Sequence, residues 1–172
     1  AAGLEFFVNS ERGLIENFSR AGRLLLQRGP QLAVWRAATD NDGLKLFDVV
    51  NWGGARFLTD VLKAGYDRIE PAGTKTSVKR TVDGVRIRIR QRWLCPGAQR
   101  FIVHAHDYLV RGDGSLQVSN RFDVDRRLPE LPRLGVSLVL PAALEQLEWF
   151  GNGPLESYAD RKRGSLVALY RS

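Results

Sequence analysis

Apolar and polar residues alternate with a period of two along much of this chain. The clearest stretch is Val85–Arg90, read VRIRIR, in which the aliphatic side chains share one face and the arginines the other. Such alternation is typical of an antiparallel strand with one buried face. Asp83-Gly84, just before it, is a hairpin signal, so the stretch is predicted to pair with residues 76–82.

Similar patterns predict further strands in both halves of the chain. They lie at residues 4–8, 13–18, 101–110, 116–124, 134–140, 146–150 and 166–170. Residues 55–64 have helical spacing instead, with Gly65 as a candidate C-cap, and residues 36–52 are interpreted as a long ordered loop. Many strands separated by regular turns predict an all-β protein, a mostly antiparallel β-sandwich with one short helix.

The composition indicates an ordinary globular protein. The 172 residues are 44% hydrophobic and carry a net charge of +7. The positive charges are scattered from Arg12 to Arg171 in no block longer than three, which argues against a nucleic-acid interface. No apolar run approaches the ~18 residues that would span a membrane. Without a signal-peptide pattern, we expect a cytoplasmic protein.

Both ends suggest a piece of something longer. The chain contains no Met, and it stops at Ser172 directly after a predicted strand. We therefore expect a fragment that is truncated at its C-terminus.

One polar loop stands out from ordinary turn sequences. Asp40, Asn41 and Asp42 follow Arg36 closely and precede Gly43. These oxygens could accept hydrogen bonds from sugar hydroxyls or hold a cation. Alternatively, Asp and Asn side chains often bond their own backbone and form a self-satisfied turn.

A second unusual segment lies near the C-terminus. Residues 149–162 read WFGNGPLESYADRK, in which a strand ending in aromatics runs into a Gly-Asn-Gly-Pro turn. Glu156, Asp160 and Arg161 could form a local salt-bridge cluster. The Gly-x-Gly pattern alone is weak evidence for phosphate binding.

The two segments together, about 110 residues apart, closely resemble β-galactosidases of glycoside hydrolase family 2. The matching patterns are Arg-Ala-x-Thr-Asp-Asn-Asp and Trp-Phe-Gly-x-Gly-Pro-x-Glu-x-Tyr-x-Asp-Arg. The resemblance runs from about Gly13 to Arg163. It departs from the family at Ala38 and Ala159, where Pro is usual, and at Ser157, where Asn is usual.

The resemblance implies a large β-sandwich of the galactose-mutarotase-like type. It places residues 1–172 at the beginning of the C-terminal, small-chain domain of such an enzyme. The family hydrolyses terminal β-D-galactosides by a retaining mechanism, with two glutamates on a preceding barrel domain. No glutamate here matches that pair by motif, so no catalytic residue is expected and the chain alone should be inactive.

The resemblance implies that this chain contributes one wall of the substrate pocket. By carry-over from the family's mobile loop, the candidate substrate-binding residues are Arg36, Asp40, Asn41 and Asp42. No metal ligand or cofactor is expected in this chain, although the longer enzyme could bind magnesium and sodium ions. The segment Trp149–Arg161 is interpreted as packing the sandwich and bracing neighbouring domains.

Two histidines offer a different chemistry. His104 and His106 lie two apart on a predicted strand and so share a face, with Asp107 on the other. Sugar mutarotases use histidines with a carboxylate for proton transfer, whereas the simpler interpretation is two solvent-facing histidines. Cys95, the one cysteine, is expected to be an inert thiol in a turn.

Three hypotheses follow from the sequence. The first is a non-catalytic portion of a β-galactosidase, whose partners are the barrel domain and, through the whole enzyme, the galactoside. The others are a stand-alone carbohydrate-binding or mutarotase-like module and a basic nucleic-acid-binding domain. We further expect self-association through open strand edges, above all at residues 134–140 and 166–170.

Overall fold

The computed structural model describes residues 3–39, 42–43, 53–155 and 162–172. The chain divides into two compact units, residues 1–139 and 140–172. Each unit is described by itself. No helix among the described residues is long and apolar enough to cross a membrane.

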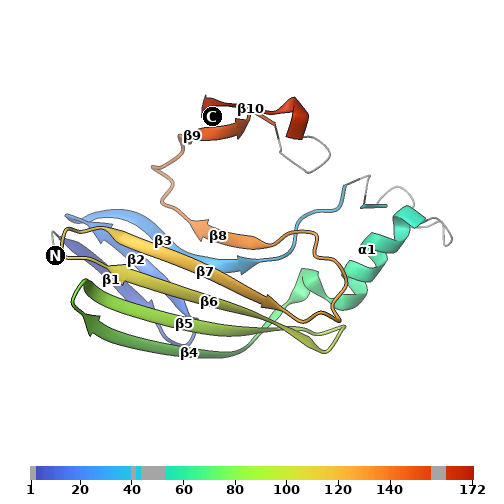
Figure 1. The fold of residues 1–172 in the computed structure, drawn as a ribbon, viewed down its shortest axis with the longest axis horizontal. Coiled ribbons are helices and arrows are strands. Elements are labelled where there is room, and N and C mark those ends of the chain that lie inside the picture. Colours follow the sequence, from blue (N-terminus) through green and yellow to red (C-terminus); the bar gives the residue numbers. More distant parts are fainter. Residues whose placement is uncertain (1–2, 40–41, 44–52, 156–161) are drawn as a thin grey trace. The chain divides into compact units, whose positions relative to one another are not determined.

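The first unit holds two four-stranded antiparallel sheets (Figure 1). One sheet has the order β1-β2-β3-β8 and the other β4-β5-β6-β7. The strands of the first are β1 (Leu4–Asn9), β2 (Leu14–Arg20), β3 (Arg23–Ala33) and β8 (Gly135–Val139). Those of the second are β4 (Glu70–Thr81), β5 (Gly84–Cys95), β6 (Arg100–Val110) and β7 (Leu116–Val124).

The alternation of β5 decides which face of the second sheet is buried. Ile87 and Ile89 are 2% and 1% exposed, whereas the intervening arginines face outward. The hairpin predicted before β5 is present, but its two loop residues are Val82 and Asp83, because Thr81 pairs with Gly84. The turn is therefore one residue earlier than the Asp-Gly signal predicts.

The two sheets pack face to face through an apolar cluster. Ile15 of β2 forms one buried cluster with Ile87 and Ile89 of β5 and Tyr108 of β6, and aromatic and aliphatic residues of β1, β2 and β3 pack against it. Burying such side chains stabilises the fold by about 1.5–3 kcal/mol each. The predicted antiparallel β-sandwich with one short helix is confirmed.

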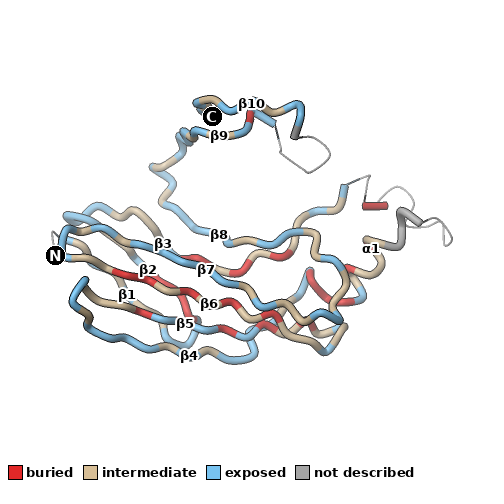
Figure 2. The backbone as a smooth tube through the Cα atoms, viewed as in Figure 1, coloured by how far each residue is buried: buried red, intermediate tan, exposed pale blue. Residues whose placement is uncertain are grey.

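The helix α1 (Gly53–Ala64) closes a second part of the core (Figure 2). Leu58, Val61 and Ala64 recur every three residues and are buried, as one face of an amphipathic helix requires. Val61 and Ala64 belong to a cluster with Trp93, Cys95 and Ile102 of the second sheet and with Leu32 of β3. Gly65 ends the helix in the left-handed region, at φ 80°, so the predicted C-cap is confirmed.

The second unit contains a separate two-stranded sheet of β9 (Glu148–Gly153) and β10 (Leu166–Arg171). A short 3-10 turn, Lys162–Gly164, precedes β10. The Trp149 and Tyr170 rings stack with centroids 5.3 Å apart across the pair. These aromatic residues give the small sheet its packing.

Two features of the first unit bear on the sequence predictions. The long strand β3 was missed, because residues 23–33 carry no clear alternation around Gly29-Pro30. β8, predicted as residues 134–140, forms the edge of its sheet and exposes Val136, Leu138 and Val139. Self-association through such edges stays a prediction.

The contact between α1 and the β5–β6 turn yields a test. A Cβ on Gly97 would lie 1.8 Å from the Lys63 carbonyl oxygen, whereas a Cβ on Gly112 would meet nothing within 4 Å. We expect Gly97→Ala to lower the free energy of unfolding by about 2–3 kcal/mol, because backbone must move. Gly112→Ala is the control and should change it by less than about 0.5 kcal/mol in urea denaturation. Equal effects would show that the helix and turn are not packed this closely.

Candidate functional site

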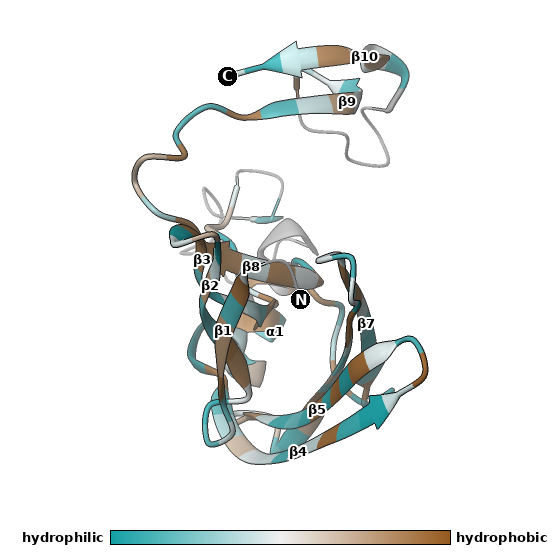
Figure 3. Cartoon of the chain, turned by 90° about the vertical axis from the view of Figure 1, so that its left-hand side faces the viewer, coloured by the Kyte–Doolittle hydropathy of each residue, from teal (hydrophilic) through white to brown (hydrophobic). Residues whose placement is uncertain are grey.

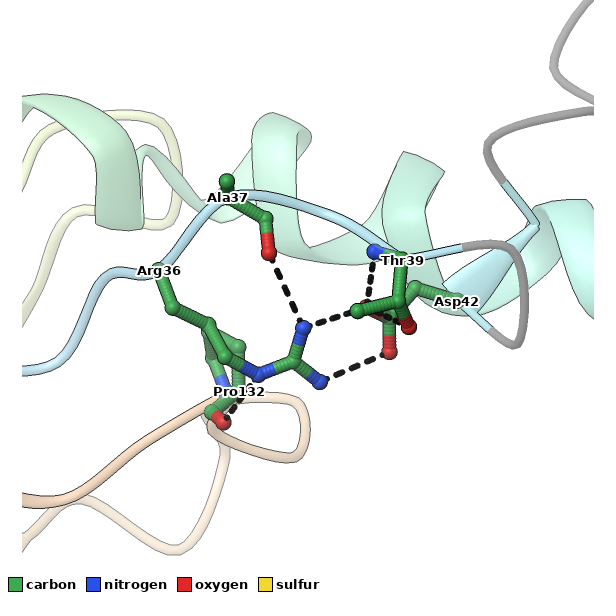
Figure 4. Close-up of polar contacts among 5 residues, drawn as sticks. All are labelled: Arg36, Ala37, Thr39, Asp42 and Pro132. Atoms are coloured by element: carbon green, nitrogen blue, oxygen red, sulfur yellow. Dashed lines mark hydrogen bonds and ion pairs between the residues drawn. The ribbon is translucent and has the colours of Figure 1, made fainter. Parts of the chain in front are cut away.

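The predicted site loop begins with a guanidinium group that is fully engaged by its neighbours (Figure 4). Arg36 follows β3, and its Nη1 and Nη2 donate to the two carboxylate oxygens of Asp42, at 2.5 and 2.9 Å. Its Nε donates to the Pro132 carbonyl at 3.2 Å and Nη1 also to the Ala37 carbonyl at 3.0 Å. This fork-to-fork pairing is the strongest geometry for an Arg–carboxylate pair. The bond from Arg36 to the Pro132 carbonyl ties the loop to a segment 96 residues further along the chain.

Asp42 in turn fixes the backbone of the loop. Its Oδ2 accepts from the Thr39 amide at 2.7 Å and from the Thr39 hydroxyl at 3.0 Å, and its own amide donates to the Thr39 carbonyl at 3.0 Å. The Arg36 hydrogen bonds outweigh the effect of burial and lower the pKa of Asp42 from 3.8 to about 2. The side chains of Arg36 and Asp42 are only 16% and 10% exposed, so the ion pair is poorly screened by solvent.

Arg36 and Asp42 are thus brought together, as partners of each other. For Asp42 alone, this bonding within the turn is what the alternative interpretation of the sequence predicts. Asp40 and Asn41, the other two candidates, lie outside the described residues. Whether any of the four contacts a substrate stays a prediction.

The histidine pair differs from its simpler prediction. His104 and His106 are 0% and 1% exposed and do not face solvent. They lie on the inner face of β6, on the same side as Ile102 and Tyr108. Their spacing of two residues from these apolar neighbours is the pattern in the sequence that indicates burial. Their rings stack on each other, with centroids 3.6 Å apart.

A chain of hydrogen bonds holds the histidines in the core. His106 Nε2 lies 2.9 Å from the Gln91 side-chain oxygen, and its Nδ1 lies 3.0 Å from the Tyr108 hydroxyl. Gln91 then donates to the Arg12 carbonyl at 2.6 Å. Gly13 permits this approach, because a Cβ there would lie 2.8 Å from the Gln91 side chain, and its φ of 64° suits glycine. The polar chain therefore joins the β1–β2 turn to the second sheet.

Burial keeps both imidazoles neutral. It lowers the pKa of His104, and it lowers that of His106 to about 3, with a smaller contribution from the neighbouring His104. His104 Nε2 lies 2.9 Å from the Asn120 side-chain oxygen, whereas its Nδ1 is buried without a hydrogen-bond partner among the described residues. A neutral, enclosed pair cannot exchange protons with a substrate in solution.

The second motif builds the small sheet of the second unit. Trp149 Nε1 donates to the Asn152 carbonyl at 3.2 Å, and the Tyr170 hydroxyl donates to the Gly153 carbonyl at 3.0 Å. A Cβ on Gly153 would come within 2.8 Å of the Tyr170 ring. These contacts hold the small sheet itself together, whereas the predicted packing against the sandwich and neighbouring domains stays a prediction. Glu156, Asp160 and Arg161 lie in the part that the structure does not describe.

The remaining candidates show no reactive arrangement. Cys95 ends β5, is 0% exposed, and burial raises its thiol pKa to about 11, so it is not an activated nucleophile. Across the described ranges, no three His, Cys, Asp or Glu side chains gather into a group that could hold a metal ion.

A comparison with protein families gives the identity of the fold. The family described as "Beta galactosidase small chain" matches residues 1–172, the full length of the sequence. The chain belongs to the β-galactosidase small-chain family. The resemblance found in the sequence is therefore confirmed.

Individual relatives agree with the family. A β-galactosidase of Halalkalibacterium halodurans is 28% identical over 93% of this chain, and one of Priestia megaterium is 30% identical over 86%. A β-galactosidase of Lactobacillus delbrueckii subsp. bulgaricus is 31% identical over 88%. The aligned part is 15%, 13% and 14% of these relatives, so the chain spans about a seventh of their length.

The ion pair of this small chain can be tested by neutralising one partner. We expect Asp42→Asn to lower the free energy of unfolding by about 2–3 kcal/mol, because it leaves a mostly buried guanidinium without its counter-charge. Asp123→Asn is the matched control, since that carboxylate is 52% exposed and lies 3.4 Å from Arg121, and it should cost less than about 1 kcal/mol. Denaturation in urea at pH 7 measures both. Similar small losses would contradict a clamping role for Asp42.

The buried histidines predict a pH dependence of stability. A base whose pKa is lowered by folding binds more protons when unfolded, so stability is lost as the pH falls below 6.5 and continues to fall toward the folded value of about 3. Between pH 7 and pH 5 we expect a loss of about 2 kcal/mol from His106 alone. His106→Gln, which cannot be protonated, should flatten this dependence in denaturation curves over that range. Asp42 does not interfere, because its own contribution is lost only below its ordinary pKa of 3.8. An unchanged slope in the variant would contradict the assignment.

Proposed function

We propose that the chain is a non-catalytic part of a β-galactosidase that hydrolyses terminal β-D-galactosides with retention of configuration. The match of residues 1–172 to the small-chain family supports this most directly. A retaining glycosidase needs two carboxyl groups flanking the scissile bond. We assign these groups to the remainder of the longer protein, as we do any magnesium or sodium ions, and expect the 172-residue chain to hydrolyse nothing by itself.

The proposed contribution of this chain is to shape one wall of the substrate pocket. Arg36 and Asp42 satisfy each other, so they act as positioning residues that hold the loop in place. We assign substrate contact to Asp40 and Asn41, which lie between them in the sequence. Fixing such groups in advance spares the entropy of ordering them when the substrate binds.

The geometry disfavours a stand-alone mutarotase-like module. That alternative needs His104 or His106 to reach a sugar, and both are enclosed between the sheets and engaged with neighbouring side chains. The two histidines therefore fit a structural role in the core, and their burial disfavours proton transfer to a sugar.

The positioning role can be separated from stability in the full-length enzyme. Arg36→Lys keeps the charge but loses the planar fork, so we expect kcat/KM for a chromogenic galactoside to fall about tenfold. Gly84→Ala serves as the control, because a Cβ there would lie 2.0 Å from the Val110 carbonyl oxygen and so weakens packing in the cluster around Ile15, not in the one that contains Trp35. It should leave kcat/KM of the folded enzyme unchanged. Equal kinetics in both variants would contradict the proposed role. Activity of the isolated 172-residue chain that changed with its own point mutations would contradict the non-catalytic assignment.

A further inference from the structure

The outer face of the second sheet carries a strongly positive surface. Along β5 the arginines alternate with residues buried in the core, and hydrophilic residues continue along β4 and β7 (Figure 3). The register places seven cationic side chains and two carboxylates on this face. The cations are Lys75, Lys79, Arg86, Arg88, Arg90, Arg92 and Arg121, and the carboxylates are Asp107 and Asp123.

A cavity of about 480 Å³ opens on this face. Its charged and hydroxyl-bearing lining includes Lys75, Arg88, Arg90, Asp107, Ser119 and Arg121. The lining also includes His106, which is only 1% exposed, but no Trp, Tyr or Phe, so a neutral sugar ring would find no exposed aromatic ring on which to stack. The chemistry of the cavity differs in this respect from a galactoside site.

The strand register explains why the face is hollow there. Lys75 pairs with Arg90, Arg90 with Ala105, and Ala105 with Arg121, which forms one row across four strands. Neighbouring strands lie about 4.8 Å apart, so Arg90 and Arg121 leave the sheet about 10 Å from each other with only a methyl group between them. The small side chain of Ala105 makes the gap between two guanidinium groups.

Two of the three cations in this row, Lys75 and Arg90, have no ion-pair partner among the described residues, and the third has an exposed one. Asp107 forms ion pairs with Arg88, at 2.9 Å, and with Arg86, at 3.5 Å, both of which lie outside this row. Arg121 reaches Asp123 at 3.4 Å in an exposed pair, and the described part of the chain supplies no ion pair to Lys75 or Arg90. Like charges directly opposite on neighbouring strands destabilise a sheet, so a bound anion would relieve this repulsion.

We propose that this cavity is a binding site for a small oxyanion ligand, one that carries a phosphate or sulfate group. The group lies above Ala105 between Arg90 and Arg121, which are suited to charge-assisted hydrogen bonds with such oxygens. Lys75 adds charge on one side, and the hydroxyls of Ser77 and Ser119, in the adjoining row, add neutral donors. The remaining volume holds the organic part of the ligand. The site uses none of the residues of the Arg36–Asp42 loop, so it stands apart from the proposed galactosidase function.

Titration of the 172-residue chain tests the proposal directly. The probes are inorganic phosphate, inorganic sulfate and a hexose 6-phosphate, with the unphosphorylated hexose as control, in 0.15 M NaCl. We expect saturable binding of the anions by calorimetry, with a dissociation constant on the order of 1 mM. In ¹⁵N NMR spectra, the amides around Arg90, Ala105 and Arg121 should shift most. The unphosphorylated hexose should leave them in place. A stronger response to the hexose phosphate would identify an organic phosphate as the ligand, and an equal response would identify the free anion.

Two double variants separate a defined site from general positive charge. Arg90→Gln with Arg121→Gln removes both flanking groups and should weaken anion binding about tenfold or more. Lys79→Gln with Arg92→Gln removes the same charge from the same face, but neither residue lines the cavity, so binding should change less than about twofold. Equal loss in the two variants, or no saturable binding of any anion, would overturn the proposal. So would tight binding of an oligonucleotide without binding of the small anions.

A third variant covers the case in which the double variants fold poorly. Ala105→Glu places a carboxylate in the gap between Arg90 and Arg121. It should abolish anion binding and raise the melting temperature in phosphate-free buffer, because it supplies the missing counter-charge. Retained anion binding in a folded Ala105→Glu protein would show that the ligand does not occupy this gap.

Discussion

The inner face of the β5–β6 pair is the surface on which the rest of the first unit depends. The two ends of this face are apolar and belong to different clusters. Ile87, Ile89 and Tyr108 pack with Ile15 of β2, whereas Trp93, Cys95 and Ile102 pack with residues of α1 and β3. Between them lies a polar middle of Gln91, His104 and His106. Apolar burial at both ends therefore encloses hydrogen-bonding groups that must find partners inside, since an unpaired buried polar group costs about 1–3 kcal/mol.

The polar middle meets this requirement almost completely. Gln91 bridges His106 and the Arg12 carbonyl, and Asn120 serves His104. Because these bonds are directional, they fix the position of the β1–β2 turn over the second sheet more narrowly than aliphatic contacts do. Burial lowers the pKa of both imidazoles, so they stay neutral inside the sandwich, whereas the outer faces of the same strands are rich in arginine. The same strands thus separate charge to one side and uncharged polar groups to the other.

The candidate site loop obeys a different constraint, because residues 36–39 belong to no helix or strand. Arg36 reaches forward to Asp42 and across to the Pro132 carbonyl, so one side chain fixes both the shape of the loop and its attachment. Arg36 and Asp42 thus hold each other in place. The family match is consistent with the positioning role that we propose for them.

The sequence by itself determined the fold class and most strand positions, because a period of two shows directly which side chains turn inward. It bounded β7 correctly as residues 116–124, and the long motifs gave the family. It missed β3, where Gly29-Pro30 interrupts the alternation, and it placed the histidines in solvent, since periodicity assigns residues to a shared face but not to the buried one. It could name Arg36 and Asp42 as candidates but not as partners. Only the tertiary structure decided that pairing, the hydrogen-bond chain through Gln91, and the gap over Ala105 between two guanidinium groups. Each of these depends on distances between segments that are brought together by the packing and pairing of strands, which no local pattern along the chain encodes.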